Sequence, residues 1–259
     1  FINDLRERYD LDSDIRGKKE AEKQRLKRPV FVYLKPNGVK VYLDYGSYVK
    51  NQSEKYFVDF KRIFTGFFVI AIINSIGMLF AYLYDPSMYE FNYKPESFVY
   101  LLLIAIILLP FQTSFEEYLV RGYLLQGIGI TTKSRLLALL IPTFLFALLH
   151  LANPEVDKMG YGFLGAYFIM GLVWGVCTLM DDGLELALGM HYGNNFVGIL
   201  IMTADWTVLQ TDSVLKYVGE PNMSMMFVTS IPLQILLLLY FSRKYNWVNW
   251  REKLLGSVQ

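Results

Sequence analysis

Six apolar runs, each long enough or nearly long enough to cross a lipid bilayer, dominate the sequence after its first sixty residues. They cover residues 63–84, 98–113, 136–151, 161–180, 184–203 and 225–242. A helix needs about 20 residues to cross a hydrocarbon core of about 30 Å. Of the 259 residues, 54% are hydrophobic. The runs therefore predict an all-α polytopic membrane protein, a bundle of about six transmembrane helices.

Charge divides the chain into three predicted parts. Residues 1–62 form a polar, basic N-terminal region, residues 63–242 a transmembrane domain, and residues 243–259 a short basic tail. Lys and Arg gather on the cytoplasmic side of membrane proteins. Basic residues precede the first apolar run and follow the last, whereas the loops 85–96 and 204–224 are acidic. We therefore expect the N and C termini to be cytoplasmic.

Several smaller features of the sequence also carry predictions. The Pro36-Asn37-Gly38 stretch predicts a hairpin turn within the N-terminal region. The chain begins with Phe1 and a stretch unlike a signal peptide, so we expect further residues before it. Gly171 and Gly175 predict close packing between helices. The single cysteine, Cys177, allows no intramolecular disulfide and is interpreted as a small core residue.

A charged motif, Glu116, Glu117 and Arg121, continues one of the apolar runs. A charged side chain at the bilayer centre costs about 2.5–3.5 kcal/mol on insertion scales, so it must be paired or used. Glu117 and Arg121 are four residues apart and share a helix face, which predicts an ion pair. Glu116 points about 100° away from that pair and remains available as a general base. A salt-bridge cluster without chemistry is the alternative.

Two histidines, His150 and His191, lie inside apolar runs. An ionisable residue within a membrane is a functional candidate by default, and a hydrogen-bonded packing role is the alternative. Phe146 precedes His150 by four residues, and Asn195 follows His191 by four. Each pair therefore shares one helix face.

Helix geometry predicts the depth of these groups. Glu116 and His150 are equally distant in sequence from a turn near Lys133, so they meet at one depth, roughly 25 Å from that turn. His191 follows the turn at 181–183 by fewer residues and lies roughly 13 Å from it. We therefore expect His191 to be shallower, unless residues 122–132 extend partly outside the lipid.

Together the motifs E-E-x-x-x-R at 116–121, F-x-x-x-H at 146–150 and H-x-x-x-N at 191–195 occur in order. In this, the sequence resembles the CPBP family of intramembrane proteases, which includes the type II CAAX prenyl endopeptidases and the bacteriocin-immunity (Abi) proteins. The resemblance covers roughly residues 62–242. Family members commonly have eight membrane helices, so either two more precede Phe1 or the basic region replaces them.

The resemblance implies an active site recessed in the membrane. By analogy with the family, Glu116 and His150 activate water, and His191 and Asn195 stabilise the oxyanion. A peptide carbonyl that becomes tetrahedral needs such a base and such donors. The residues expected to support this site are Glu117, Arg121 and Phe146.

Cofactor, partner and function each leave an alternative. We expect no cofactor, and the alternative is zinc bound by Glu117, His150 and His191, although the sequence has no H-E-x-x-H motif. The expected partners are a peptide or membrane-protein substrate and the lipid bilayer, with no nucleic acid. The alternative functions are a non-catalytic membrane scaffold or bacteriocin-immunity-type protein that binds a partner through the same polar cavity, and a transporter or proton relay.

Overall fold

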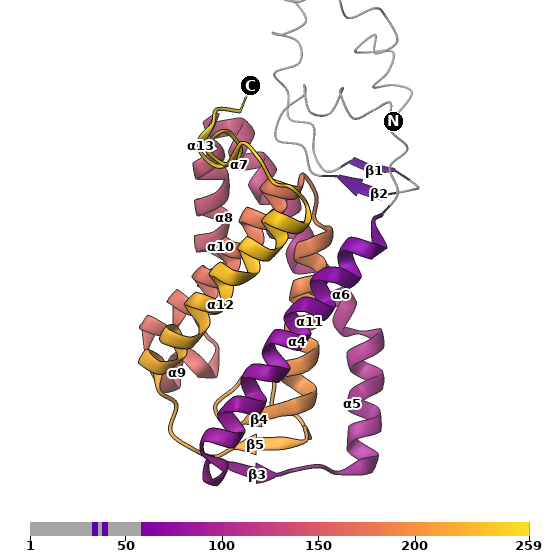
Figure 1. Ribbon diagram of the computed structural model, residues 1–259, viewed down its shortest axis with the longest axis vertical. Coiled ribbons are helices and arrows are strands. Elements are labelled where there is room, and N and C mark those ends of the chain that lie inside the picture. Colours follow the sequence, from indigo (N-terminus) through magenta and orange to yellow (C-terminus); the bar gives the residue numbers. More distant parts are fainter. Residues whose placement is uncertain (1–32, 36–37, 41–57, 259) are drawn as a thin grey trace, which may run out of the picture.

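The computed structural model describes residues 33–35, 38–40 and 58–258, and these are mostly helical (Figure 1). The longer helices are α4 (Phe60–Tyr84), α5 (Pro95–Ile107), α6 (Leu109–Glu117), α7 (Leu125–Thr132), α8 (Arg135–Leu149), α10 (Leu164–Asp181), α11 (Glu185–Ile201) and α12 (Met223–Lys244). The shorter elements are η2 (Pro86–Met88), the π-helix η3 (Tyr118–Leu124), α9 (Pro154–Met159), η4 (Tyr161–Phe163) and α13 (Trp250–Leu255). All six apolar runs are largely helical, which confirms the all-α class.

Four helical segments in the described part of the chain are long and apolar enough to cross a membrane. They are Phe60–Tyr84, Pro95–Thr132, Tyr161–Asp181 and Met223–Lys244. Helix α8 is apolar but has only 15 residues, and α11 has 17. The protein is therefore an integral membrane protein, and the count of about six crossings stays a prediction.

The segment Pro95–Thr132 is not one regular helix. Helix α5 ends at Ile107 and α6 starts with Pro110 in its first turn. Proline lacks the backbone N–H that a helix interior needs and interrupts the hydrogen-bond ladder there. The π-helix η3 follows Glu117 directly. Such widened turns are frequent at functional sites, and this one lies within the charged motif.

A small sheet closes one end of the helical bundle (Figure 1). It consists of β3 (Tyr89–Phe91), β5 (Leu215–Tyr217) and β4 (Met202–Ala204), in that order, with β5 antiparallel to β3 and parallel to β4. The sequence predicted no strand here. The last two residues of the apolar run 184–203 belong to β4 rather than to a helix.

Within the predicted N-terminal region, the strands β1 (Tyr33–Lys35) and β2 (Gly38–Lys40) pair antiparallel. This pairing confirms the predicted hairpin, although Pro36 and Asn37 lie outside the described residues. The rest of the region up to residue 57 also lies outside them. In the C-terminal tail, α13 packs against α8 and α10.

Helices α4 and α11 pack backbone to backbone through three glycines. A Cβ atom at Gly66 would lie 2.6 Å from the carbonyl oxygen of Leu186, and one at Gly193 would lie 2.6 Å from that of Phe67. At Gly189 a Cβ would overlap the α4 backbone. Small residues of this kind allow membrane helices to approach closely. This contact fixes α11, which carries the third motif.

The expected packing role of Gly171 and Gly175 is confirmed. A Cβ at Gly175 would lie 2.6 Å from Cδ1 of Leu139 in α8. At Gly171 it would lie 3.0 Å from Nη2 of Arg121 and 3.1 Å from Cδ1 of Phe146. The glycines therefore bring α10 close to α8 and leave room for the arginine.

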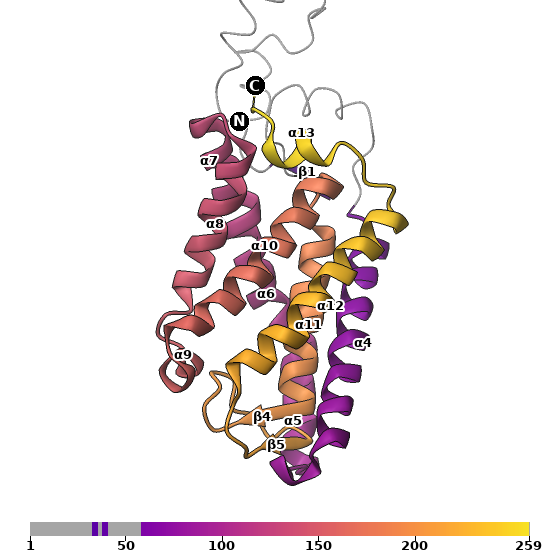
Figure 2. The same cartoon turned by 60° about the vertical axis from the view of Figure 1, so that its left-hand side comes forward.

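The start of α4, the turn between α10 and α11, and the end of α12 lie together, at the end of the molecule opposite the sheet (Figure 1). Nε of Arg62 is 2.8 Å from Oδ2 of Asp181, and Nε1 of Trp247 donates to Oδ1 of the same aspartate at 3.2 Å. Nζ of Lys253 is 2.6 Å from Asp182. Figures 1 and 2 show that α7 and the start of α8 extend beyond this turn.

Candidate active site

The two neighbouring glutamates of α6 have different surroundings. Glu117 is fully buried, and its Oε1 accepts a hydrogen bond from Nη1 of Arg121 at 2.9 Å. The side chain of Glu116 is 26% exposed and accepts a hydrogen bond from Nε2 of Gln112. The spacing therefore predicted the partner of Glu117 correctly, and it left Glu116 outside that ion pair.

Arg121 is buried by the groups that it contacts. Its Nη2 donates to the carbonyl oxygen of Gly171 at 3.1 Å. Its Cζ lies 4.5 Å from the ring centre of Phe146 and 5.5 Å from that of Trp174. A buried charge needs both a counter-ion and hydrogen bonds, and Arg121 has both. It is therefore fixed in place beside the carboxylate of Glu117.

His191 joins α11 to both glutamates. Its Nδ1 is 2.7 Å from Oε1 of Glu117, and its Nε2 is 3.7 Å from Oε2 of Glu116. Its ring packs 4.6 Å from that of Trp174. His191 and the first motif therefore meet at one level. The α7–α8 end extends beyond the α10–α11 turn (Figures 1 and 2), in line with the exception that we expected for residues 122–132.

His150 lies directly after the last residue of α8. Its Nδ1 is 2.8 Å from the carbonyl oxygen of Phe146, and the two rings are 4.7 Å apart. The ring centre of Phe146 is also 6.3 Å from that of His191, so Phe146 contacts both histidines. Within the described residues, no hydrogen bond joins His150 to Glu116.

Asn195 is held by its neighbours rather than by the charged cluster. Nδ2 of Asn194 donates to Oδ1 of Asn195 at 3.0 Å, and Oδ1 of Asn194 accepts from Nδ2 of Asn74 in α4 at 3.0 Å. Because the side-chain oxygen of Asn195 accepts this bond, the NH₂ group of Asn195 is the part that can donate to a substrate. Among the described residues it makes no hydrogen bond with His191 or Glu116.

Two residues outside the three motifs also belong to this site, and sequence reasoning missed one of them. Gln112 precedes Glu116 by four residues, so the two share a helix face. Trp174, which packs on His191 and Arg121, lies in an apolar run whose pattern contains no signal for such a role.

The residues of the zinc alternative do not form a cluster. Nowhere in the described chain do three or more His, Cys, Asp or Glu side chains form a group that could hold a metal ion. Oε1 of Glu117 already bonds to Arg121 and His191. The expectation of a site without a cofactor stays a prediction.

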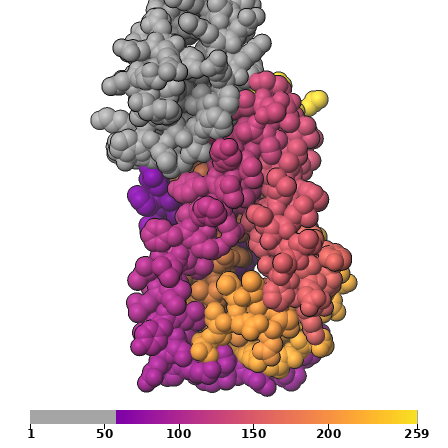
Figure 3. All heavy atoms as spheres, turned by 180° about the vertical axis from the view of Figure 1, so that it is seen from behind, coloured from indigo at the N-terminus to yellow at the C-terminus, as the bar shows by residue number. Residues whose placement is uncertain are grey.

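The space-filling view from behind shows a hollow in the side of the bundle (Figure 3). It lies between the magenta atoms of the first-motif segment and the salmon atoms of the segment from α8 to α10. Orange atoms from the end of α11 and the loop after it border its lower edge. The surface of the helical bundle is thus open sideways, toward the region that lipid would occupy.

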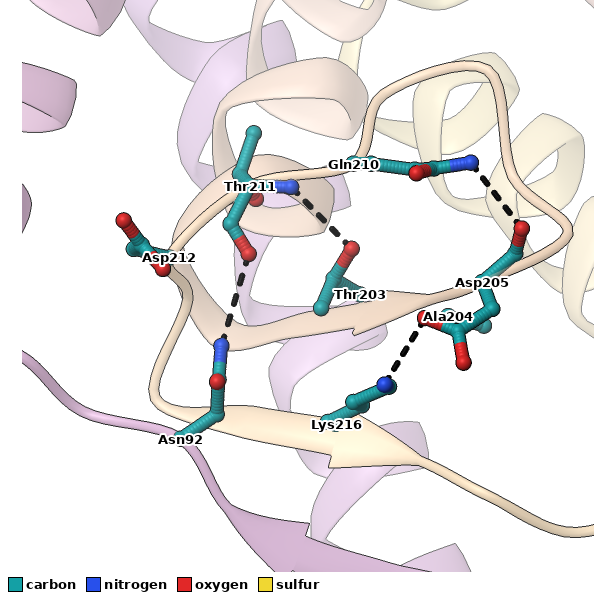
Figure 4. Close-up of a pocket in the computed structure, with 8 residues that line it drawn as sticks. All are labelled: Asn92, Thr203, Ala204, Asp205, Gln210, Thr211, Asp212 and Lys216. Atoms are coloured by element: carbon teal, nitrogen blue, oxygen red, sulfur yellow. Dashed lines mark hydrogen bonds and ion pairs between the residues drawn. The ribbon is translucent and has the colours of Figure 1, made fainter.

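A second, polar pocket of about 240 Å³ lies at the sheet (Figure 4). Its walls include Lys216, which is 2.8 Å from Asp205, and Asp212, which is 2.6 Å from Lys94. Thr211 also lines it. The hydrogen bond from Lys94 lowers the pKa of Asp212, and the one to Asp205 raises the pKa of Lys216. No residue of the three motifs lines this pocket.

These helices and their buried cluster of acid, guanidinium and imidazole groups define a polytopic membrane protein with a polar centre. The family model described as type II CAAX prenyl endopeptidase Rce1-like matches residues 95–197. All three motifs lie inside that segment. The match confirms the resemblance to the CPBP proteases over that segment, which is less than half of the chain.

One similar protein is itself uncharacterized. It is the uncharacterized protein YyaK of Bacillus subtilis (strain 168), which is 36% identical over 149 residues. The aligned part is 56% of this chain and 49% of YyaK, so the chain spans about half the length of that relative. No solved structure matches the chain.

Proposed function

We propose that this protein is an intramembrane endopeptidase that hydrolyses peptide bonds in membrane-associated or lipidated peptides with water activated by Glu116. One observation supports this most directly. Oε2 of Glu116 lies 3.7 Å from Nε2 of His191, and 26% of the Glu116 side chain is exposed, whereas Glu117 beside it is fully buried and paired. A general base needs access to water and substrate, and the neighbouring ion pair leaves Glu116 unneutralised for that task.

The proposed reaction uses both histidine motifs. Glu116, assisted by His150, takes a proton from water, and the hydroxide formed adds to the carbonyl carbon of the peptide bond. His191 and the amide of Asn195 stabilise the negative charge that develops on the carbonyl oxygen. Collapse of this intermediate breaks the C–N bond, and the proton held by the base passes to the leaving amine. Arg121 holds Glu117, Glu117 holds His191, and neither Arg121 nor Glu117 transfers protons.

The hollow in the side of the bundle supports a membrane-borne substrate. A peptide anchored in lipid would approach from the side, between the first-motif segment and α8, without leaving the bilayer. We also propose that the end with the basic tail faces the cytoplasm, since Lys and Arg gather there. In that arrangement the predicted regions 1–62 and 243–259 flank the protease domain on one side of the membrane.

The test is the variant Glu116→Gln in proteoliposomes, assayed with a fluorogenic peptide library. Loss of a general base lowers rates by about 10²- to 10⁴-fold, and we expect a loss of that size. Glu96→Gln, which changes an exposed glutamate in the first turn of α5, serves as the matched control. If Glu116→Gln cleaves the peptides at the rate of the unchanged protein, Glu116 is not the general base.

If the library is not cleaved by the unchanged protein, a binding role through the same centre gains support instead. Partner binding that survives the changes Glu116→Gln, His150→Ala and His191→Ala would then show that chemistry is unnecessary.

A further inference from the structure

His150 lies where helical hydrogen bonding no longer fixes the backbone. It is the first residue after α8, with φ of −95° and ψ of 7°, and its N–H bonds to the carbonyl oxygens of Ala147 and Leu148. Helix ends fray more readily than helix interiors. A histidine that must meet a water molecule in one orientation therefore needs contacts beyond those of its own helix.

Side-chain contacts provide that orientation. Nδ1 of His150 is 2.8 Å from the carbonyl oxygen of Phe146. A carbonyl oxygen only accepts, so this bond places the proton on Nδ1 and leaves Nε2 as the nitrogen that can take a proton. The rotation of the ring about this bond must still be fixed.

Tyr167, in the first turn of α10, supplies the remaining constraint. Its ring is stacked on that of His150, with centroids 4.0 Å apart and an angle of 24° between the planes. Its hydroxyl accepts a hydrogen bond from Nδ2 of Asn153 at 3.0 Å. Asn153 lies in the turn after α8, and its N–H bonds to the carbonyl oxygen of His150. The tyrosine is thus tied to the turn that carries the histidine.

We propose that Tyr167 is a positioning residue for the reaction, because its ring face holds the imidazole of His150 in the orientation that directs Nε2 toward the attacking water. This inference rests on the proposed function, in which His150 assists Glu116. It adds a residue outside the three motifs. Tyr167 does not touch the reacting atoms and acts only through His150.

The kinetic test compares Tyr167→Leu with Tyr167→Phe, using the best-cleaved peptide of the fluorogenic library in proteoliposomes. Leucine removes the ring face, and we expect kcat to fall about 10- to 100-fold with KM unchanged, since small misplacement of a catalytic group costs this much. Phenylalanine keeps the ring and should restore most of kcat. Tyr161→Leu, which changes a 77% exposed tyrosine just before α10, is the matched control.

Two results would overturn the proposal while leaving the proposed function intact. One is full kcat in Tyr167→Leu together with inactive His150→Ala. The other is a Tyr167→Phe variant as impaired as Tyr167→Leu, since the ring face would then be irrelevant. Full activity in His150→Ala would instead contradict the proposed function itself.

A second measurement requires neither activity nor a stable leucine variant. The chain has two histidines, so the imidazole resonances of His150 can be assigned in the NMR spectrum of the detergent-solubilised protein by their loss in His150→Gln. Stacking on the face of Tyr167 should shift the carbon-bound ring protons of His150 upfield. Unshifted resonances in the folded protein would show that the stack does not form, and the inference would fail.

Discussion

Gly193 offers the sharpest test of how the site is held, because it lies between His191 and Asn195 on α11 and faces α4. In Gly193→Ala, the new Cβ would lie 2.6 Å from the carbonyl oxygen of Phe67 and 2.7 Å from Cγ2 of Ile70. Gly198, in the same helix, has no heavy atom within 4 Å of such a Cβ. Gly198→Ala is therefore the matched control.

The expected size of the effect follows from two opposing contributions. Alanine is favoured over glycine in a helix by about 0.8–1.0 kcal/mol, and Gly198→Ala should show this gain alone. Overpacking typically costs about 1–3 kcal/mol, and we expect the upper end for Gly193→Ala because a backbone carbonyl cannot rotate away. The two variants should therefore differ by about 3 kcal/mol, or about 6–12 °C in Tm for a chain of this size.

The chain carries its own reporter for this measurement. Cys177 is the single cysteine and is 0% exposed, so a thiol-reactive fluorophore labels the detergent-solubilised protein only when its core opens. Labelling during a temperature ramp gives Tm for each variant. Equal Tm values for Gly193→Ala and Gly198→Ala would refute the close contact between α4 and α11.

Two further predictions concern the aromatic contact between the histidines and the sheet at the end of the bundle. Phe146→Ala should lower the free energy of unfolding by about 3–5 kcal/mol, because the ring is 1% exposed. The thermal assay described above measures this effect. Leu149→Ala, at a 65% exposed position, should change Tm little. The hydrogen bond from Lys94 lowers the pKa of Asp212 in the folded protein below its ordinary 3.8. The stability that this bond contributes is therefore present above pH 3.8 and is lost as pH falls through the pKa of the folded protein. The protection of β5 against hydrogen exchange, corrected for the intrinsic exchange rate at each pH, should therefore fall below about pH 4. Lys94→Ala should weaken this pH dependence, and an unchanged profile in that variant would contradict the assignment.

The sequence predicted well whatever depends on short spacings within one helix. The apolar runs gave the helices, since their length and composition are visible without any knowledge of neighbours. The ion pair between Glu117 and Arg121 followed from four-residue spacing, and it persists although the intervening turn is a π-helix. The order of the three motifs was enough to indicate the family.

Other features depend on how separate helices are rotated and shifted against one another. The sequence did not predict that the carboxylate of Glu117 would bond to His191. The depth of His191 relative to the first motif depended on whether residues 122–132 extend beyond the α10–α11 turn. Spacing within one helix does not decide that.

The β3–β5–β4 sheet is another feature that the sequence did not predict. Each strand has three residues, too few for a recognisable alternation, and β3 lies far in the sequence from its partner β5. Residue spacing along one helix is set by its own 3.6-residue turn and can be read from the sequence. The rotation and offset of two helices are set by packing between residues distant in the chain, such as Gly193 and Phe67. The sequence by itself therefore determined which chemical groups each helix carries, and only the tertiary structure decided which of them meet.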